Sequence, residues 1–561
     1  MAIGSRSYEK ENPNPVLVHE HVRWLIPSIG DLIFIVLLGL LAFTNLSVRL
    51  LGDAGIGWHI RTGQLILATH AIPHSDPFSS TMAGQPWFAW EWLYDMLVGW
   101  LDKVASLNGV VFLTASIIAL TFSWTFRLLL RRGTSLIVAL TLVLLAAAAA
   151  MIHFFARPHV VSWLFAVFWF WILDSSETNR CPSSAGHNQH LLWLLPLLML
   201  LWVNVHGGFL LAFVLLGLYW PGAAWQWFTL KEDRFEDVRQ KATAGKRAQD
   251  LALIGVASAL ATLANPYGWK LHLHIFRYLS NRFLMDHIDE FQSPNFHGVA
   301  QKCFAVLLLL AFVALAAKKR ETSQLRASEV LVVLFAAYSG LYASRNIPMS
   351  SLLLILVIGP WLSNGAQEIA DRFAKWWPAS KLRISRHFLQ RMQVIESSLR
   401  GHVWSIAAMA LTCWITFHGG QLGPTPLMDA HFDDKRFPIA AVDHLAKRDL
   451  GRGRASWTVD PGPVFAPDYW GGYFIYRLYP QIRLSIDDRH DFYGDAFLKS
   501  YLKLMHAEPG WQDFLEQYPV RYVALPKDSA PANILSESPS WHRVYEDEVV
   551  AIFAPARSPV H

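Results

Sequence analysis

Charged residues are scarce in this sequence. Only 16% of its 561 residues are Asp, Glu, Lys or Arg, whereas 53% are hydrophobic. Such a composition excludes an ordinary soluble domain and a disordered chain, and it is typical of a polytopic membrane protein. The net charge of +5 is small, and the basic clusters follow membrane topology, as shown below. We therefore expect no nucleic-acid partner.

Cysteines and sharp ligand motifs are also scarce. Cys181, Cys303 and Cys413 lie far apart, and their spacing predicts neither a disulfide framework nor a zinc site. No Gly-rich phosphate loop typical of nucleotide-binding proteins is present. The polar N-terminus, segment 1–30, favours a signal-anchor helix over a cleaved signal peptide.

Long apolar windows are what the sequence does have. A bilayer requires windows of roughly 17 to 25 residues, and shorter apolar cores span it with flanking residues. We find about eleven candidate spans on this criterion. The segment Phe88–Leu107 is apolar too, but acids and a lysine interrupt it, which indicates a helix lying in the membrane interface. The candidate cores are Asp31–Leu50, Gly109–Leu130, Thr134–Ile152, Val160–Leu173, Leu191–Val205, Gly208–Phe228, Leu251–Ala264, Cys303–Ala317, Val330–Ala343, Ile347–Ser363 and Val403–Phe417.

The positive-inside rule sets the orientation of these spans. With segment 1–30 in the cytoplasm, every strongly basic joint falls on the cytoplasmic side of the membrane. Treating Phe88–Leu107 as a further span would place two of these joints outside. The basic joints are Arg131–Arg132, Lys231–Arg247, Lys318–Arg326 and Arg372–Arg400.

The predicted fold is mainly α: a polytopic transmembrane domain, 31–419, followed by an extracytoplasmic α/β domain, 420–561. Residues 51–108 form a long first outer loop. In the tail, periodicity predicts helices and strands separated by Pro and Gly. The predicted tail helices are Phe437–Lys447 and Asp495–Ala507, and the predicted strands are Arg521–Leu525 and Arg543–Phe553.

The first outer loop carries two candidate catalytic acids. Asp53 comes just after the first span, where partial desolvation and neighbouring cations set the basicity of a carboxylate. It suits a general base for an acceptor hydroxyl or amine, and a helix cap is the structural alternative. Glu91, between Trp90 and Trp92, is either an acid partner or an anchor of the interfacial helix.

The same loop contains candidate metal ligands, His59, His74 and Asp76. Imidazole and carboxylate groups suit Mn²⁺, Mg²⁺ or Zn²⁺, so a divalent metal is a candidate cofactor. Their spacing matches no established metal motif, and the alternative is a set of hydrogen-bonded loop residues.

Cations at the outer ends of the spans are candidate ligands for a lipid-linked phosphate. Arg157, His206 and Arg345 stand at such ends, and Lys270 follows the turn Asn265–Gly268. Arginines at the membrane edge are costly unless they are paired, and a phosphate is a suitable anionic partner. The alternatives are contacts with lipid headgroups for the arginines and a satisfied core position for His206.

Two unusual stretches occur in the tail, PDYWGGYFIYRL and SIDDRHDFYGD. Aromatic, glycine and acidic residues at this density form either an acceptor cleft or ordinary packing against the membrane domain. The candidate cleft residues are Asp468, Tyr469, Trp470, Asp487, Asp488 and Arg489.

These features together resemble the GT-C superfamily of membrane glycosyltransferases, which includes protein O-mannosyltransferases, the aminoarabinose transferase of lipid A and oligosaccharyltransferases. The similarity covers most of the chain as architecture. The stretches GDAGIGWHIRTGQ, ARPH, NVHGG, NPYG and YWGGYFIYRL with DDR are similar to a bacterial branch of this superfamily.

The resemblance implies roles for individual residues. Asp53 matches the catalytic acid of the first loop, and the donor would be a polyprenyl-phosphate sugar whose phosphate meets Arg157, His206 and Arg345. No DxD-type pair adjoins Asp53 and the tail has only a loose counterpart of the oligosaccharyltransferase acceptor motif. The resemblance therefore establishes neither a metal requirement nor sequon recognition.

We expect a glycosyltransferase acting on the outer face of the membrane, with a protein, lipid or glycan as the acceptor. An enzyme similar to O-antigen ligases is an alternative within the same class, but such enzymes rely on a late outer loop. The non-catalytic alternatives are a lipid-linked glycan transporter, which requires polar residues in the middle of spans, and an assembly subunit of an envelope polysaccharide system.

Overall fold

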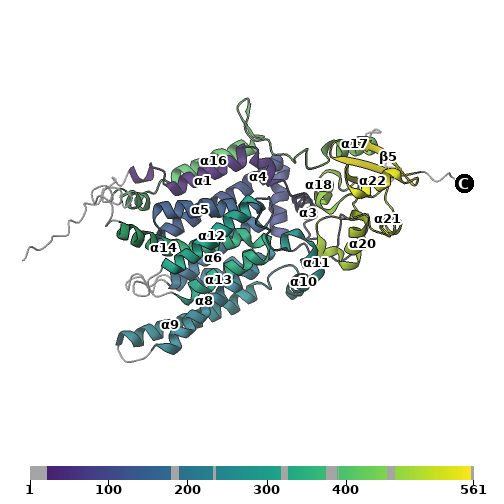
Figure 1. The fold of residues 1–561 in the computed structure, drawn as a ribbon. Helices are drawn as coiled ribbons and strands as arrows, with labels where there is room; N and C mark the ends of the chain where they lie inside the picture. The colour runs from purple at the N-terminus through teal and green to yellow at the C-terminus, as the bar shows by residue number, and fades with distance from the viewer. Residues whose placement is uncertain are drawn as a thin grey trace, which may run out of the picture.

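The computed structural model describes residues 22–177, 189–230, 235–317, 326–373, 388, 391–450 and 462–556. The chain forms a bundle of long helices with a smaller α/β domain at one end (Figure 1). Residues 1–21 of the predicted N-terminal segment, Cys181 and parts of the basic joints Lys231–Arg247, Lys318–Arg326 and Arg372–Arg400 lie outside the described residues, whereas Arg131 and Arg132 lie within them.

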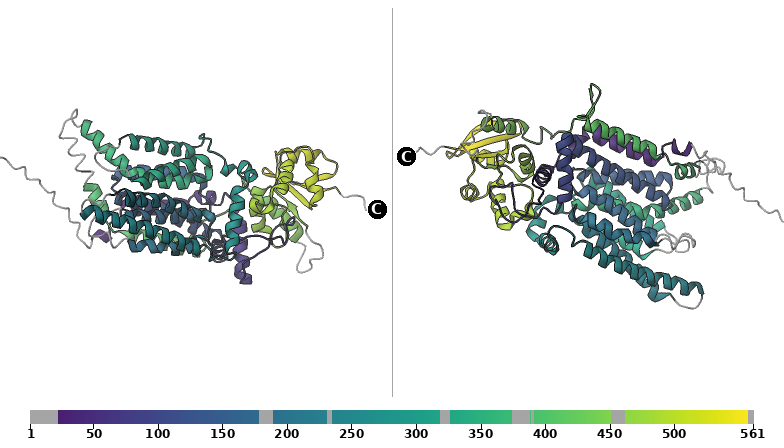
Figure 2. Two further views of the ribbon diagram at one scale, coloured as in Figure 1. Left: turned by 90° about the horizontal axis from the view of Figure 1, so that it is seen from below. Right: turned by 180° about the vertical axis from the view of Figure 1, so that it is seen from behind.

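Each predicted apolar core falls on a helix of the bundle (Figure 2). Within the described part of the chain, six helices are long and apolar enough to cross a membrane, and four more are apolar but shorter. The remaining predicted apolar core, Leu251–Ala264, begins in the second half of α9 (Phe235–Ala261). The bundle helices are α1 (Ile29–Phe43), α4 (Trp92–Arg131), α5 (Leu136–Ala150), α6 (His159–Glu177), α7 (Leu195–Trp202), α8 (Leu210–Thr229), α9 (Phe235–Ala261), α12 (Val299–Ala317), α13 (Ala327–Tyr342), α14 (Ile347–Phe373) and α16 (His402–Phe417).

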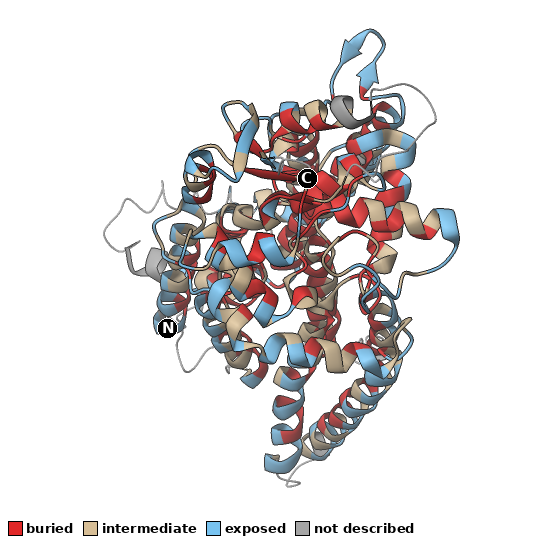
Figure 3. Cartoon of the chain, turned by 90° about the vertical axis from the view of Figure 1, so that its right-hand side faces the viewer, coloured by how far each residue is buried: buried red, intermediate tan, exposed pale blue. Residues whose placement is uncertain are grey.

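Burial within the bundle follows from sequence pattern. In α14 the run from Leu352 to Ile358 is fully buried on all sides, as expected for a central helix that is apolar all round. In α12, by contrast, Phe312 is 70% exposed and Leu309 is 64% exposed (Figure 3 shows exposure along the chain). Large apolar side chains on the outside of a helical bundle match the hydrocarbon of a bilayer and not water. The protein is a multi-pass membrane protein.

The predicted interfacial helix is the first part of α4. Ala105 and Ser106 have non-helical backbone angles, and this break separates the segment Trp92–Val104 from the apolar span that follows. Leu97, Trp100 and Val104 lie three and four residues apart and are each at least 40% exposed. An exposed apolar stripe at this spacing is typical of a helix lying on a membrane surface.

The tail is the predicted α/β domain. Its main sheet has the order β3-β4-β6-β5, with β3 parallel to β4 and the other pairs antiparallel. The single strand predicted over Arg543–Phe553 is in fact a hairpin, because the chain turns at the acidic stretch between β5 and β6. The strands are β3 (Val464–Phe465), β4 (Tyr522–Pro526), β5 (Trp541–Glu546) and β6 (Val550–Pro555), and the helices are α17 (Ile439–Leu450), α18 (Asp468–Leu478), α19 (His490–Tyr493), α20 (Asp495–Met505), α21 (Gln512–Gln517) and α22 (Ala530–Glu537).

A two-stranded hairpin, β1 (Gln421–Leu422) and β2 (Thr425–Pro426), links the last bundle helix to the tail. Short elements complete the outer end of the bundle in the described ranges. They are α2 (Leu46–Leu50), α3 (Ile56–Thr69), α10 (Trp269–Ser280), α11 (Arg282–His287) and the 3-10 turns η2 (Met151–His153), η4 (Gly207–Phe209), η5 (Asp289–Phe291) and η6 (Ser344–Asn346); η1 (Val22–Trp24) and η3 (Gln189–Leu194) are the other 3-10 turns.

Two glycines allow the tail to dock closely on the first outer loop. A Cβ at Gly57 of α3 would lie 2.0 Å from the carbonyl oxygen of Gly472 in α18, so the two helices touch backbone to backbone. Arg61 Nε donates to the carbonyl of Tyr476 at 2.8 Å, and the Tyr476 hydroxyl donates to Asp102 at 3.0 Å. Loop and tail therefore form one structure above the membrane domain.

Candidate functional site

A guanidinium group lies between two carboxylates where the first loop, the ARPH joint and the tail meet. Arg157 Nη1 is 3.4 Å from Asp53 Oδ1 and 2.8 Å from Asp488 Oδ2. Asp53 precedes α3, and its Oδ1 also accepts the backbone N–H of Gly55 at 2.9 Å. Its other oxygen, Oδ2, has no hydrogen-bond partner among the described residues. The site thus has one cation held by two acids, with one carboxylate oxygen of Asp53 available.

Gly55 leaves the space that the guanidinium occupies. A Cβ at this position would lie 1.3 Å from Arg157 Nη1 and 2.4 Å from Asp488 Oδ2. Trp58, one helical turn later, forms the wall of the same space. Its indole Nε1 donates to Asp488 Oδ1 at 2.9 Å, and Arg157 lies 5.7 Å above its ring.

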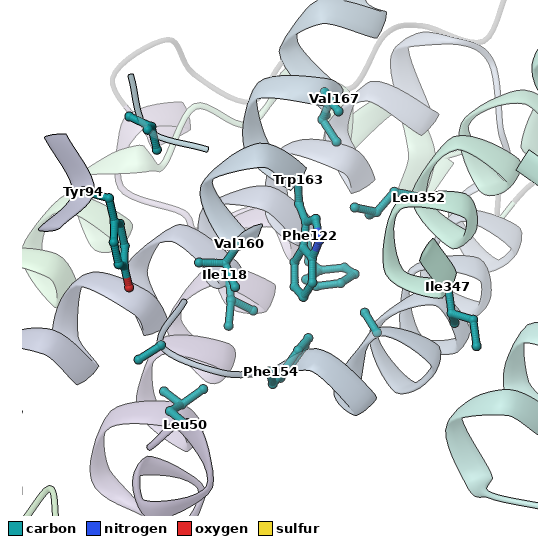
Figure 4. Packing of buried hydrophobic residues seen from close by; sticks show 14 of the residues in the cluster. Leu50, Tyr94, Ile118, Phe122, Phe154, Val160, Trp163, Val167, Ile347 and Leu352 are labelled. Atoms are coloured by element: carbon teal, nitrogen blue, oxygen red, sulfur yellow. The ribbon is translucent and has the colours of Figure 1, made fainter. Parts of the chain in front are cut away.

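Packed aromatic residues hold Arg157 in place. The loop that carries Arg157 begins at Phe154, whose ring centroid is 6.0 Å from those of both Phe122 and Trp163 (Figure 4). The backbone N–H of Ala156 donates to the carbonyl of Leu50 at 2.7 Å, which ties this loop to the end of α2. The backbone position of Arg157 is therefore fixed by the bundle core.

Burial shifts the proton affinities of this group. Burial, with a further contribution from the Asp53 charge, raises the pKa of Asp488 to about 6 in spite of Arg157. Burial alone would lower the pKa of Arg157, but Asp53 and Asp488 outweigh this effect and raise it. Arg157 thus remains charged, and Asp488 titrates near neutral pH.

A second polar group surrounds Glu91, which precedes α4. Its Oε2 is 3.7 Å from His59 Nε2, and its Oε1 is 3.7 Å from His206 Nε2. His59 Nδ1 is 2.5 Å from Asp95 Oδ1, and both of these side chains are fully buried. The His59 ring stacks on Trp58 at 3.6 Å between centroids, so Trp58 joins this group to the first. Burial raises the pKa of Glu91 to about 8, although the charge of Arg157 acts against this shift.

Two of the predicted phosphate ligands, Arg345 and Lys270, do not contact this site in the described structure. Arg345 of η6 pairs with Glu290 at 3.2 Å and lies 4.6 Å above the Phe291 ring. Lys270 is exposed at the start of α10, and no ion pair or side-chain hydrogen bond in the described structure joins it to the site. Arg157 and His206, in contrast, stand beside the candidate acids.

The predicted metal ligands do not converge. His59 faces Asp95 and Glu91, His74 is exposed with its ring 5.2 Å from that of Tyr267, and Asp76 forms an ion pair with Arg489 at 2.8 Å. Among the described residues, no group of three or more His, Cys, Asp or Glu has the arrangement of a metal site. The reason is local: Asp76 caps its own turn by accepting the N–H of Ser79 at 2.9 Å.

The six residues predicted to form an acceptor cleft have three different environments. Arg489 pairs with both Asp487 and Asp76 in a buried cluster, in which its Nη2 lies 2.6 Å from Asp487 and 2.8 Å from Asp76. Trp470 is buried, and its Nε1 donates to the carbonyl of Arg436.

The other three cleft residues differ from these. Asp468 accepts from His490 at 2.6 Å and from the Tyr501 hydroxyl at 2.7 Å, whereas Tyr469 is 51% exposed. Asp488 alone of the six reaches Arg157 and Asp53. Within the stretch DDR, Asp488 therefore belongs to the site, whereas Asp487 and Arg489 belong to the contact between the first loop and the tail.

Sequence reasoning missed Gly55, Trp58 and Asp95. Gly55 and Gly57 flank Ile56 within the stretch GDAGIGWH, and this glycine spacing was the available signal for a close approach. Nothing in the sequence signals that Asp95, on the interfacial helix, turns inward to His59.

Comparison with known proteins supports the architecture. No family model matches the sequence, and the search of curated proteins gives no match either. The apo oligosaccharyltransferase of Archaeoglobus fulgidus has a similar structure: TM-score 0.51 at 11% identity, covering 95% of this chain and 74% of that one. The same enzyme tethered with an acceptor peptide containing the NVT sequon gives 0.52 at 11% identity, covering 94% and 73%.

ArnT from Cupriavidus metallidurans, bound to undecaprenyl phosphate, gives a TM-score of 0.48 at 11% identity, covering 94% of this chain and 97% of that one. The likeness to the oligosaccharyltransferase structures extends over nearly the whole of this chain and confirms the expected GT-C-like fold.

Proposed function

We propose that this protein is a membrane glycosyltransferase that moves a sugar from a polyprenyl-phosphate donor to an acceptor at the outer face of a bacterial inner membrane. The observation that carries the proposal is the guanidinium of Arg157 between Asp53 and Asp488 at the end of the bundle. The GT-C-like fold supports it, because related structures include enzymes whose names describe oligosaccharide transfer.

In this proposal the leaving phosphate takes the place of one carboxylate beside Arg157. The phosphate gains negative charge as the bond from the sugar to its oxygen breaks, and a fixed cation stabilises that charge without reorganisation. His206 adds a second donor: Gly208 N–H donates to its Nδ1 at 3.1 Å, which leaves the hydrogen on Nε2. Asp488, with a pKa of about 6, releases Arg157 when it is protonated.

Asp53 orients the acceptor. Its free Oδ2 accepts a hydrogen bond from the acceptor hydroxyl or amine, while Oδ1 stays fixed by Gly55 and Arg157. A protein, a lipid or a glycan is a suitable acceptor in chemical terms, since each supplies such a group. Arg345 and Lys270 contribute at the periphery, by the exchange of Glu290 for phosphate and by attraction of the lipid headgroup.

The test is transfer of radiolabelled sugars from a panel of polyprenyl-phosphate donors in membranes that contain the wild type, Asp53→Asn or Asp429→Asn. Asp429 is an exposed acid near the start of the tail and serves as the matched control. We expect Asp53→Asn to lower transfer at least about 100-fold and Asp429→Asn to leave it unchanged. Equal transfer by all three proteins refutes the assignment of Asp53, and translocation of the lipid without transfer would favour the transporter alternative.

A further inference from the structure

A line of polar side chains runs from the site into the protein interior. It consists of Glu91, His59 and Asp95, with His206 on the other side of Glu91. A tenth of the Glu91 side chain is exposed, whereas the side chains of His59 and Asp95 are fully buried. Glu91 is therefore the member of the line that reaches the site.

The hydrogen positions along this line follow from its contacts. With Asp95 as the carboxylate, its Oδ1 accepts from His59 Nδ1, so Nδ1 carries the hydrogen and Nε2 has the lone pair. His206 has the opposite tautomer, because its Nδ1 accepts the N–H of Gly208. Glu91 thus faces an N–H group on one side and a lone pair on the other.

The unsatisfied atoms of this line point to a function beyond packing. His59 Nε2 and Asp95 Oδ2 are buried and have no hydrogen-bond partner among the described residues. A buried polar atom without a partner costs roughly 1 to 3 kcal/mol. In the described structure, His59 Nε2 points toward Glu91 Oε2 across 3.7 Å, a separation that a small rotation of Glu91 or a single water molecule closes.

We propose that Asp95 and His59 form a buried proton-accepting pair that takes up, through Glu91, the proton released by the acceptor. This inference rests on the proposed transfer function and deepens it. The pair has the arrangement of an acid that orients an imidazole, with the imidazole lone pair directed at the group to be deprotonated. Glu91 is the catalytic residue in this arrangement, and His59 and Asp95 are positioning residues that act through it.

The proposed reaction conserves its electron pairs and its protons. The acceptor oxygen or nitrogen forms its bond to the sugar carbon, while the sugar–phosphate bond breaks and its electron pair leaves with the phosphate. The proton of the acceptor passes to Glu91, and the Glu91 proton passes to His59 Nε2. Asp95 stabilises the resulting imidazolium. After product release the proton returns to water by the same route.

Asp53 and Glu91 therefore have different roles in the proposed reaction. Asp53 Oδ1 is held by Arg157 Nη1 at 3.4 Å, and Asp53 therefore orients the acceptor. Glu91 has two imidazole neighbours and is the better proton carrier. The charged and titratable groups that face the pair are Glu91, Arg157, Arg489, His159, His206 and Tyr94; the Tyr94 ring centroid is 5.5 Å from that of His59.

The test uses the purified full-length protein in lipid nanodiscs with a polyprenyl-phosphate sugar that the wild type turns over. Transfer rate is measured from pH 5.5 to 9, together with binding of undecaprenyl phosphate and thermal unfolding. The variants are His59→Gln, Asp95→Asn and Glu91→Gln, with His74→Gln as the control histidine of the same loop. We expect His59→Gln and Glu91→Gln to lower the transfer rate at least about 100-fold. Their affinity for undecaprenyl phosphate should stay within about twofold of that of the wild type.

Asp95→Asn is the decisive variant, because it keeps the volume of the side chain. Without the negative charge His59 is a weaker base, so the acidic limb of the pH–rate profile, where the base becomes protonated, shifts to lower pH and the maximal rate falls by at least tenfold. If Asp95 has a purely structural role, Asp95→Asn lowers the unfolding temperature and leaves that limb of the pH–rate profile in place. This outcome would overturn the inference. If Asp53→Asn abolishes transfer while His59→Gln and Asp95→Asn retain it, the proton line fails alone. If the wild type transfers no lipid-linked sugar, the proposed function fails and the inference fails with it.

Discussion

Substituting Gly55 by alanine should remove the cation from the site without unfolding the protein. The backbone of Gly55 has φ −56° and ψ −23°, which suits alanine as well as glycine. The added Cβ would meet the end of a flexible Arg157 side chain at 1.3 Å and not a backbone atom. We therefore expect a folded protein with a displaced guanidinium.

The size of the effect follows from these distances. Moving Nη1 from 1.3 Å to ordinary van der Waals contact with the new Cβ requires a shift of about 2 Å, and a misplacement of about 1 Å in an active site costs on the order of 100-fold in rate. The shift breaks the 2.8 Å contact with Asp488, a charge-assisted hydrogen bond worth roughly 1.5 to 3 kcal/mol. We expect transfer to fall about 100-fold, which equals about 2.7 kcal/mol in the activation barrier.

Gly57→Ala is the matched control, because its added Cβ meets the carbonyl oxygen of Gly472 at 2.0 Å, a backbone atom that cannot move aside. We expect Gly57→Ala to lower thermal stability, by about 1 to 3 kcal/mol, as in overpacked cores. The assay compares transfer rate and unfolding temperature for both variants in detergent. Full transfer activity in Gly55→Ala would refute the role of the guanidinium, and equal loss of stability in both would refute the distinction between them.

Three further outcomes are expected. Arg489→Leu leaves Asp76 and Asp487 buried without their cation, so thermal unfolding should show a loss of about 3 to 5 kcal/mol; unchanged stability would contradict this. Burial disfavours charged His490, but Asp468 outweighs it and raises the pKa of His490 from 6.5 to about 9. The resulting stabilisation is complete below pH 6.5 and is lost as pH rises toward 9, so the melting temperature should fall across this window in the wild type and not in Asp468→Asn. Finally, because Arg157 occupies the space between the acids, treatment with a chelator should leave transfer unchanged; loss of activity that Mn²⁺ restores would refute this prediction.

The fold was largely predictable from the sequence. Apolar runs must become helices in a bilayer, since no water is present to satisfy a free backbone, and the described helices follow those runs closely. The break at Ala105 and Ser106 was foreshadowed by the charges of Phe88–Leu107. The hairpin between β5 and β6 was not predicted, because a short acidic turn within a strand-like run has little effect on periodicity.

The site was predictable only in part. Position along the chain put Asp53, Glu91, Arg157 and His206 at one end of the bundle, because alternate joints of a helical bundle share a face. Which tail residue reaches them was not predictable: adjacent residues Asp487 and Asp488 point in different directions, one to Arg489 and the other to Arg157. That choice depends on the docking of α18 against α3, a contact between segments more than 400 residues apart in the sequence.

The contribution of Asp488 by the tail has a consequence for biosynthesis. Asp53 and Arg157 emerge early during synthesis, but Asp488, the second acid beside the guanidinium, follows Arg157 by 331 residues. A nascent chain whose tail has not yet docked therefore holds an incomplete site. Under the proposed function, transfer begins only once the tail has crossed the membrane and docked on the first outer loop.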